Sequence, residues 1–328
     1  MDPLETVKIE KDTSFILMLG AYRRGHRVYY LPEGGMTLKD GKVYFRVVSV
    51  VPQDVVNCPF IKKEMQELSS DEVGAVFVRS DPPFDETYLM NTWLLERLPA
   101  KIPVINRPAG IRTVNEKLWA TQFVSITPKT IVSRDKNDLT GFLKSEKDVI
   151  AKPTDGFGGA SVFRVRKGDP NANVILETVS RRWTKDIILQ KYIPAAQKGD
   201  KRILLLNGEP LGAVLRVHAK GEHRNNFFAG GTPAKTTITA NDKKIIRILK
   251  PELKKLGLYF VGIDIIGRYL IEVNVTSPTC LREMNRLYNK NLEYPIIEFA
   301  KSLAVEYQRK KKSHGRGYCR GGINAVPF

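Results

Sequence analysis

A glycine-rich segment in the middle of the chain most restricts the folds that this sequence can adopt. Three of the four positions from Gly156 to Gly159 are glycine, and two apolar runs, 149–153 and 161–165, flank the segment. This strand–loop–strand order differs from the strand–loop–helix order of a Walker loop. Glycine N–H groups can converge on a phosphate without Cβ clashes, and Lys152 can neutralise that phosphate from the preceding strand. The segment predicts a phosphate-binding hairpin, with a flexible turn as the alternative.

A predicted hairpin over residues 260–275 carries three side chains that can donate oxygen atoms. On its second strand, Glu272 and Asn274 alternate with apolar residues and therefore share one face. The tight turn at residues 267–268 brings Asp264 back beside them. Such oxygen donors suit Mg²⁺. A solvated edge hairpin is the alternative, but it explains Asp264 less well, because this charge interrupts an apolar strand and needs a partner if buried.

Cationic residues lie between these two patterns in the sequence. Lys201 and Arg202 begin a predicted strand, and Arg216 ends the next one. Residues 218–231 are rich in hydrogen-bond donors and predict a lid that closes on an anionic intermediate, with an ordinary surface loop as the alternative. Residues 190–194 give a weak indication of a hinge whose backbone donors lie near a purine.

The overall composition constrains function only loosely. The net charge of +18 would suit an anionic partner, but a general basic bias plus a basic tail is favoured for most of the excess, since six basic residues lie in the stretch 309–320 alone. A nucleic-acid-binding protein would need basic residues gathered on one face with interleaved aromatics, and no such motif occurs in the predicted folded part. The three cysteines, Cys58, Cys280 and Cys319, lack the spacing of zinc or redox sites. Without a signal sequence or a long apolar run, the chain is expected in the cytoplasm.

The first third of the chain alternates predicted helices and strands. A helix is expected over 11–24 and strands over 26–30 and 73–78. The segment 79–85 contains two prolines and follows the last of these strands, at the end where open α/β sheets bind ligands. A further helix is expected to begin near Asp85.

Together these segments resemble the ATP-grasp superfamily, and within it the bacterial-type glutathione synthetases. The order that is typical of the superfamily runs through Asn115-Glu116-Lys117, Lys152 with its glycine loop, 190–194, Asp200-Lys201-Arg202, Asp264 and Glu272-Val273-Asn274. The narrower resemblance lies in 79–85, in Arg224-Asn225-Asn226 with Gly230-Gly231, and in 274–280. It extends from Met1 to about residue 305.

The resemblance implies a fold of mixed α/β and α+β class, an ATP-grasp fold with an open N-terminal α/β domain. The N-terminal substrate-binding domain is expected over 1–115, and the central subdomain with the glycine-rich loop over 116–190. The C-terminal subdomain with the metal site and lid is expected over 191–308. A basic, disordered tail is expected over 309–328.

The resemblance also implies an activity: ATP-dependent ligation of glycine to γ-glutamylcysteine, which gives glutathione, ADP and phosphate through an acyl phosphate. Another ATP-grasp ligase, one that adds glutamate or a D-amino acid, is the nearest alternative. The implied ATP-binding residues are Lys117, Lys152, Gly156, Phe157, Gly158, Gly159, Ala160, Gln190, Tyr192, Ile193 and Asp200.

The remaining implied roles concern the metal, the reacting groups and the substrates. Asp264, Glu272 and Asn274 would hold Mg²⁺, with Mn²⁺ as another suitable ion. Arg202 and Arg216 would stabilise the phosphoryl oxygens and the tetrahedral oxyanion. The enzyme is expected to be a homotetramer. The residues that would bind its substrates are Arg79, Arg224 and Asn226 for the dipeptide and Ser277 for glycine.

The chain departs from the family pattern in a few places. A short apolar strand usually precedes the Met-Asp-Pro segment, which here opens the chain. We therefore expect that the natural protein starts upstream, or that this form is less stable and binds dipeptide poorly. Ser80 stands where lysine is common, and residues 232–235 lack the usual Gly-Arg-Gly start.

Overall fold

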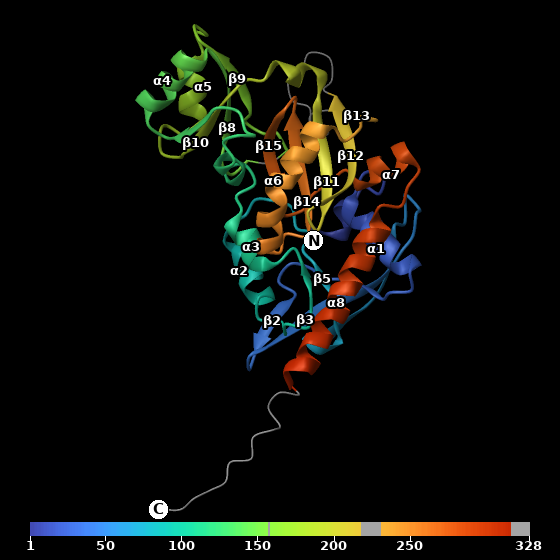
Figure 1. Ribbon diagram of the computed structural model, residues 1–328. Coiled ribbons are helices and arrows are strands. Elements are labelled where there is room, and N and C mark those ends of the chain that lie inside the picture. Colours follow the sequence, from blue (N-terminus) through green and yellow to red (C-terminus); the bar gives the residue numbers. More distant parts are fainter. Residues whose placement is uncertain (157, 218–230, 316–328) are drawn as a thin grey trace, which may run out of the picture.

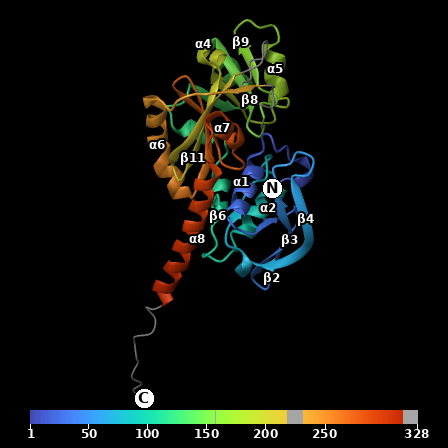
Figure 2. The ribbon, with the colours of Figure 1, turned by 90° about the vertical axis from the view of Figure 1, so that its right-hand side faces the viewer.

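The computed structural model describes residues 1–156, 158–217 and 231–315. The sheet of the middle segment lies toward one end of the molecule and the N-terminal sheet toward the other (Figures 1 and 2). The sheet of the last segment lies between them. The expected mixed α/β class is confirmed by this arrangement of helices and sheets.

Most strands of the N-terminal part pair with antiparallel neighbours. Strand β3 pairs with β1 and β2 along one edge and with β4 along the other. Among the described strands only β5 and β6 pair in parallel, and the predicted strand 73–78 is reduced to Val76–Phe77. The elements are η1 (Leu4–Thr6), α1 (Thr13–Arg23), β1 (Val28–Tyr30), β2 (Met36–Lys39), β3 (Lys42–Pro52), β4 (Phe60–Ser69), η2 (Ser70–Glu72), β5 (Val76–Phe77), α2 (Glu86–Leu95), β6 (Val104–Ile105) and α3 (Pro108–Thr113).

Side-chain caps fix where the first two α-helices begin. The Asp12 carboxylate accepts a hydrogen bond from Phe15 N at 2.7 Å, and the Asp85 carboxylate accepts one from Tyr88 N at 2.9 Å. Both bonds satisfy backbone donors that have no partner within the helix. The expected helix starts near Asp12 and Asp85 are therefore confirmed.

The middle segment forms an antiparallel sheet in the order β7-β10-β8-β9. Strands β8 and β9 pair with each other on either side of the glycine-rich segment, as the strand–loop–strand pattern predicted. Helices α4 and α5 pack against this sheet around Leu139, Val149, Leu176 and Leu189. The elements are η3 (Trp119–Gln122), β7 (Thr130–Ser133), α4 (Lys136–Glu146), β8 (Asp148–Pro153), β9 (Phe163–Arg166), α5 (Ala172–Val179) and β10 (Ile187–Lys191).

The last segment forms a sheet in the order β13-β12-β11-β14-β15, buried on both faces. Ile203 packs with Leu249 of α6 on one face, whereas Leu204 packs with Met284 of α7 on the other. The alternation of strand side chains produces this division. The elements are η4 (Pro194–Lys198), β11 (Asp200–Leu206), β12 (Glu209–Val217), β13 (Thr232–Ala234), α6 (Ala240–Leu256), β14 (Phe260–Ile266), β15 (Tyr269–Asn274), α7 (Leu281–Tyr288) and α8 (Glu293–Gly315).

Helix α8 returns to the N-terminal part and shares a core with α1. Phe15 and Leu19 belong to the same buried cluster as Ile296 and Ala300. At Gly20 a Cβ atom would lie 2.5 Å from Glu293 Cγ, so glycine permits the close approach of the two helices. The first and last helices therefore complete one core.

The boundary expected at residue 308 falls within helix α8, and the expected disorder of the tail stays a prediction. Helix α8 continues to Gly315, so residues 309–315 are helical, while 316–328 lie outside the described residues. Lysine and arginine are good helix formers, so a run of them extends a helix at little cost. In the part of the chain that the structure describes, no helix is long and apolar enough to cross a membrane.

Candidate active site

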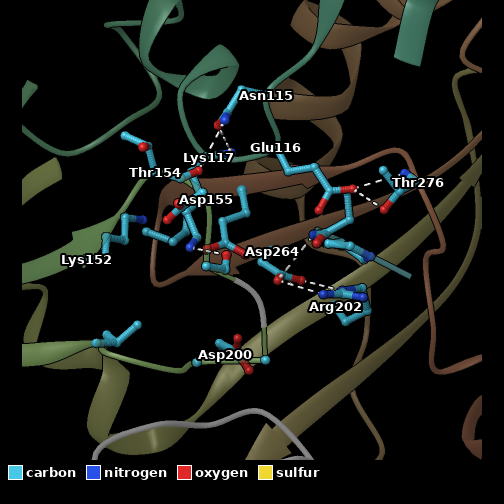
Figure 3. Close-up of a pocket in the computed structure, with 18 of the residues that line it drawn as sticks. Asn115, Glu116, Lys117, Lys152, Thr154, Asp155, Asp200, Arg202, Asp264 and Thr276 are labelled. Atoms are coloured by element: carbon cyan, nitrogen blue, oxygen red, sulfur yellow. Dashed lines mark hydrogen bonds and ion pairs between the residues drawn. The ribbon is translucent and has the colours of Figure 1, made fainter. Parts of the chain in front are cut away.

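A cavity of about 420 Å³ lies between the middle sheet and the last sheet. Residues 81–84 and 111–117 close it from the N-terminal side. Figure 3 shows Lys117 beside Lys152 of the middle sheet and Asp264 of the last sheet around the same space. The cavity brings together most of the residues that the sequence singled out: Lys117, Lys152, Gly156, Gly158, Gly159, Gln190, Tyr192, Ile193, Asp200, Arg202, Arg216, Asp264, Glu272, Asn274 and Ser277.

A few of the expected site residues do not line this cavity. Ala160 is absent from its wall, and Arg79 lines a neighbouring cavity instead. Phe157, Arg224 and Asn226 lie outside the described residues, as does most of the expected lid.

Two buried lysines face the cavity beside the glycine-rich segment. Lys117 Nζ donates to the carbonyl oxygens of Pro153, at 3.0 Å, and of Gly156. Lys152 Nζ, on β8, donates to Gln190 Oε1 at 3.3 Å. Burial lowers the pKa of Lys152, and the nearby Glu272 only partly opposes this effect. A buried ammonium that donates to a neutral amide, rather than to a carboxylate, is suited to bind an anion such as a phosphate.

The glycine-rich segment has a backbone that requires glycine. Gly158 and Gly159 have φ angles of +61° and +76°, in the left-handed region. A Cβ atom at Gly156 would lie 2.8 Å from the Pro153 ring. The sequence pattern therefore reflects real conformational demands, which a flexible turn would not impose.

Arginine–carboxylate pairs connect three neighbouring strands of the last sheet. In the sheet register, Arg202 of β11 lies opposite Asp264 of β14, and Asp200 lies opposite Arg216 of β12. Arg202 Nη2 donates to Asp264 Oδ2 at 2.8 Å, and Arg216 Nη2 lies 2.9 Å from the same oxygen. Burial would raise the pKa of Asp264, but the two guanidinium groups outweigh it and hold that pKa well below its ordinary value. The partner that buried Asp264 needs is therefore a pair of arginines.

The residues expected to hold a divalent metal ion have suitable oxygen atoms. Glu272 lies opposite Asp264 in the β14–β15 register, and its carboxylate has no hydrogen-bond partner among the residues described. Asn274 Nδ2 donates to Gly262 O at 3.3 Å, which leaves the amide oxygen of Asn274 for other contacts. No group of three or more His, Cys, Asp or Glu that could hold a metal occurs in the described ranges, so such an ion needs the Asn274 oxygen and oxygens from a bound molecule.

Comparisons with known proteins place this chain in a family. The family model "Prokaryotic glutathione synthetase, N-terminal domain" matches residues 1–112, and "Prokaryotic glutathione synthetase, ATP-grasp domain" matches residues 116–289. The chain belongs to the prokaryotic glutathione synthetase family. Glutathione synthetase of Escherichia coli strain K12 is 42% identical over 300 residues, which cover 90% of this chain and 92% of the relative. Glutathione synthetase of Shewanella oneidensis is 40% identical over 294 residues, covering 89% and 93%.

Solved structures support the fold of this glutathione synthetase family member. The ATP-grasp ligase PsnB complexed with its minimal precursor has a TM-score of 0.59 at 17% identity and covers 88% of this chain and 94% of that one. D-cycloserine synthetase DcsG has a TM-score of 0.55 at 16% identity and covers 72% and 86%. The ATP-grasp fold expected from the resemblance is thus confirmed, and the chain is an ATP-dependent ligase whose fold class uses ATP with a divalent metal ion. The nucleic-acid-binding alternative is not favoured.

An apolar part of the cavity wall adjoins the segment that was expected to contact a purine. Ile150, Ile193 and Ile266 line it together with Tyr192. The Arg164 guanidinium carbon lies 3.5 Å from the centroid of the Tyr192 ring, and this cation–π contact holds the ring in place. In a member of the glutathione synthetase family, such a wall suits the flat face of a nucleotide base.

Loops from the N-terminal and last segments meet at the other end of the cavity. Ser277 Oγ donates to the Asp81 carboxylate, and Arg79 Nη1 donates to Pro278 O at 3.1 Å. Arg79 Nε also donates to Ser14 Oγ of α1 at 3.0 Å, so this buried arginine links its own loop to residue 278 and to helix α1. Sequence reasoning assigned no role to several further cavity residues of the motif segments 79–85 and 274–280, among them Asp81, Thr279 and Cys280.

Proposed function

We propose that the chain joins glycine to the cysteinyl carboxylate of γ-glutamylcysteine, using ATP, to form glutathione, ADP and phosphate. The observation that carries this proposal is one cavity that combines buried lysines, oxygen donors for a metal ion and a buried arginine pair. Membership of the glutathione synthetase family over nearly the whole chain supplies the substrate class.

Phosphate binding falls to groups that the fold already places around the glycine-rich segment. Lys117 and Lys152 neutralise the phosphates, and the N–H groups near Gly158 and Gly159 donate to them. Asp264, Glu272 and Asn274 would hold Mg²⁺, or Mn²⁺, beside these lysines. When bound, that ion neutralises charge on the phosphoryl group as it passes to the substrate carboxylate.

Arg202 and Arg216 act on the acyl phosphate that results. Asp264 and Asp200 fix both guanidinium planes, so their N–H groups are oriented before the substrate arrives. They stabilise the transferred phosphoryl oxygens, and then the oxyanion that forms when the glycine amine attacks. Ser277 contributes to seating glycine, and the assignments of Arg79, Arg224 and Asn226 to the dipeptide stay predictions.

A coupled assay of ADP release tests the proposed reaction. With γ-glutamylcysteine, glycine and Mg·ATP together, we expect steady ADP release and stoichiometric glutathione. Omission of either γ-glutamylcysteine or glycine should abolish most of the ADP release. Replacing glycine with glutamate or D-alanine tests the nearest alternative, and faster turnover with either acceptor would contradict the assignment of glycine.

Two further features are proposed from the family resemblance. A reaction that consumes ATP suits a cytoplasmic location, and the family pattern implies a homotetramer. Light scattering coupled to gel filtration checks the second point. A mass near four times the chain mass of 37.1 kDa is expected, and a monomer would contradict the assignment.

A further inference from the structure

The carboxylate of Glu116 holds the backbone that follows the metal-donor strand β15. Its Oε1 atom accepts a hydrogen bond from Val275 N at 2.7 Å. The same oxygen accepts bonds from Thr276 N at 3.0 Å and Thr276 Oγ1 at 2.9 Å (Figure 3). Its backbone carbonyl accepts a fourth bond, from Val273 N at 2.9 Å. One residue therefore contacts the backbone on both sides of Asn274.

A second polar side chain, Asn106, also holds the backbone at Val275. Asn106 Nδ2 donates to Val275 O and Phe260 O, both at 2.8 Å, and Asn106 Oδ1 accepts from Phe260 N at 2.7 Å. Asn106 is only 3% exposed. Both backbone polar groups of Val275 are thus bound by side chains from a distant part of the sequence, which fixes the segment where β15 ends.

The held segment lies between two residues of the proposed site. Val275 and Thr276 separate Asn274, a proposed metal donor, from Ser277, proposed to seat glycine. Glu116 also precedes Lys117, whose backbone N–H is bound separately by Asn115 Oδ1 at 3.1 Å. The distance from the phosphate-binding lysine to the metal donor and the acceptor loop is therefore set through Glu116.

We propose that Glu116 is a positioning residue that fixes Asn274 and Ser277 and so aligns the metal ion with the amine acceptor, an inference that rests on the proposed function. Three donors converge on one carboxylate oxygen in a largely buried place, where such bonds are strong. Burial raises the pKa of Glu116, and the bonds from Thr276 and Val275 oppose this rise. Groups that orient metal donors affect metal affinity although they do not touch the ion.

Three variants of the full chain test the positioning role. Glu116→Ala removes all three bonds, whereas Glu116→Gln retains an acceptor oxygen of the same reach. Glu293→Ala is the matched control, because Glu293 is also buried and accepts a bond from Asn285 Nδ2, but lies away from the cavity. For each variant, Mn²⁺ binding is measured by electron paramagnetic resonance with a non-hydrolysable ATP analogue present. The KM for glycine and the analogue's affinity without metal are measured in parallel.

Glu116→Ala is expected to weaken Mn²⁺ binding about 10- to 100-fold and to raise the KM for glycine. Affinity for the analogue without metal should change by less than about threefold, because Asn115 and Pro153 hold Lys117 independently. Glu116→Gln should recover most of the Mn²⁺ affinity, and Glu293→Ala should keep it. Unchanged Mn²⁺ binding in Glu116→Ala would overturn the proposal. An equal loss of Mn²⁺ affinity in Glu116→Gln would also overturn it, because that loss would indicate an effect of charge. An equal loss of Mn²⁺ affinity in Glu293→Ala would overturn it as well.

The Mn²⁺ measurement separates this inference from the proposed reaction. It requires only nucleotide and metal binding, so it remains informative if the unmodified chain fails to form glutathione. Suppose that the unmodified chain forms no glutathione but Glu116→Ala still shows the expected loss of Mn²⁺ affinity. This result would reject the substrate assignment and keep the positioning role. If the unmodified chain forms glutathione but Glu116→Ala binds Mn²⁺ normally, the substrate assignment is kept and the positioning role is rejected.

Discussion

Lys152 and Glu272 lack the ion pairs that neutralise several other charged residues of the cavity. Asp200, Asp264 and the two arginines form ion pairs, whereas Lys152 has a bond to the neutral amide of Gln190. Glu272 has no hydrogen-bond partner among the described residues. Both side chains face the position expected for phosphates and a metal ion. A buried ammonium held for a ligand in this way lowers stability until that ligand binds, whereas Glu272 is only partly buried and its carboxylate keeps contact with solvent.

Replacement of Lys152 by methionine is expected to stabilise the protein while it impairs nucleotide binding. Removal of the buried ammonium should increase the free energy of unfolding by about 1–4 kcal/mol. Loss of its bonds to phosphate should raise the KM for ATP about 10- to 100-fold. Thermal melting and steady-state kinetics check the two effects. A destabilised variant would contradict the view that Lys152 is held for a ligand.

The same residue predicts a pH dependence of stability. Burial lowers the pKa of Lys152 in the folded state, so between that pKa and its ordinary value of 10.5 the unfolded chain binds more protons. The destabilisation is therefore fully present below the folded pKa and is relieved as the pH rises through this window. Denaturant unfolding from pH 7 upward should show a stability difference between Lys152→Met and the unmodified chain that shrinks toward alkaline pH.

Glu272→Gln removes one negative charge from the proposed metal site at constant size. We expect kcat to fall about 100- to 1,000-fold, with the melting temperature nearly unchanged. Glu209→Gln, on the exposed start of β12, is the control and should remain active. Full activity of Glu272→Gln at high Mg²⁺ would refute the metal assignment.

The sequence predicted those site residues whose signals are local. Alternation along β15 placed Glu272 and Asn274 on one face, and glycine content identified the loop between β8 and β9. Glu116 and Asn106 carry no such signal, because their partners at residues 260 and 273–276 are brought near them only by the tertiary fold. The arginine partners of Asp264 were likewise hidden, since cross-strand register cannot be read from separate strands.

At the scale of whole elements, the packing of α1 against α8 depends on Gly20. Gly20→Ala places a methyl group against Glu293, which is itself bonded to Asn285, so overpacking should cost about 1–3 kcal/mol. Gly141 lies exposed within α4, where an added Cβ atom would meet nothing within 4 Å, and is the matched control. Gly141→Ala should instead stabilise by about 0.5–1 kcal/mol. Chemical denaturation of both variants checks the opposite signs, and equal effects would contradict the packing argument.

A cavity of about 800 Å³ lies beside strands β1 and β5, and Met1 is among the residues that line it. Within the described residues, β1 pairs only with β3 and β5 only with β6, so each has an edge without a strand partner. Leu17, Phe77 and Ile297 contribute apolar surface. We infer that this space can accept one more strand beside β1 or β5.

Fusion of an apolar β-branched pentapeptide ahead of Met1 tests that interpretation. Each large side chain that becomes buried should contribute roughly 1.5–3 kcal/mol, and new strand pairing should satisfy backbone groups. We expect the melting temperature to rise by more than about 5 °C and the KM for the dipeptide to fall. A Gly-Ser pentapeptide of equal length is the control. Equal melting temperatures for the two fusions would show that the cavity does not accept a strand.

At the scale of the whole molecule, the cores cross the boundaries that the sequence indicated. The largest buried cluster unites Phe15 of α1 with Phe260 of β14, Leu281 of α7 and Ile296 of α8. Motif order suggested consecutive domains over 1–115, 116–190 and 191–308, but it cannot reveal that the last helices pack on the first. That information lies in matching helix faces, which a single apolar pattern does not identify.

The isolated segment 116–289, which the ATP-grasp family model matches, is therefore expected not to fold cooperatively. It retains Phe260, Leu281 and Met284 but lacks α1 and Asn106, which cover and hold them. Circular dichroism melting and aggregation assays on this fragment, beside the full chain, check the expectation. A sharp, reversible transition in the fragment would show that the shared core is dispensable.

The shared core of α1 and α8 also has a consequence for the order of events during synthesis. Helix α1 ends at Arg23, but its partner α8 does not begin until Glu293, so most of the chain is translated between them. At roughly 5–20 residues per second, the part of α1 that packs on α8 stays uncovered for about 14–54 seconds. A chain released early would expose that part of α1, so ribosome-bound intermediates are the species most in need of chaperones.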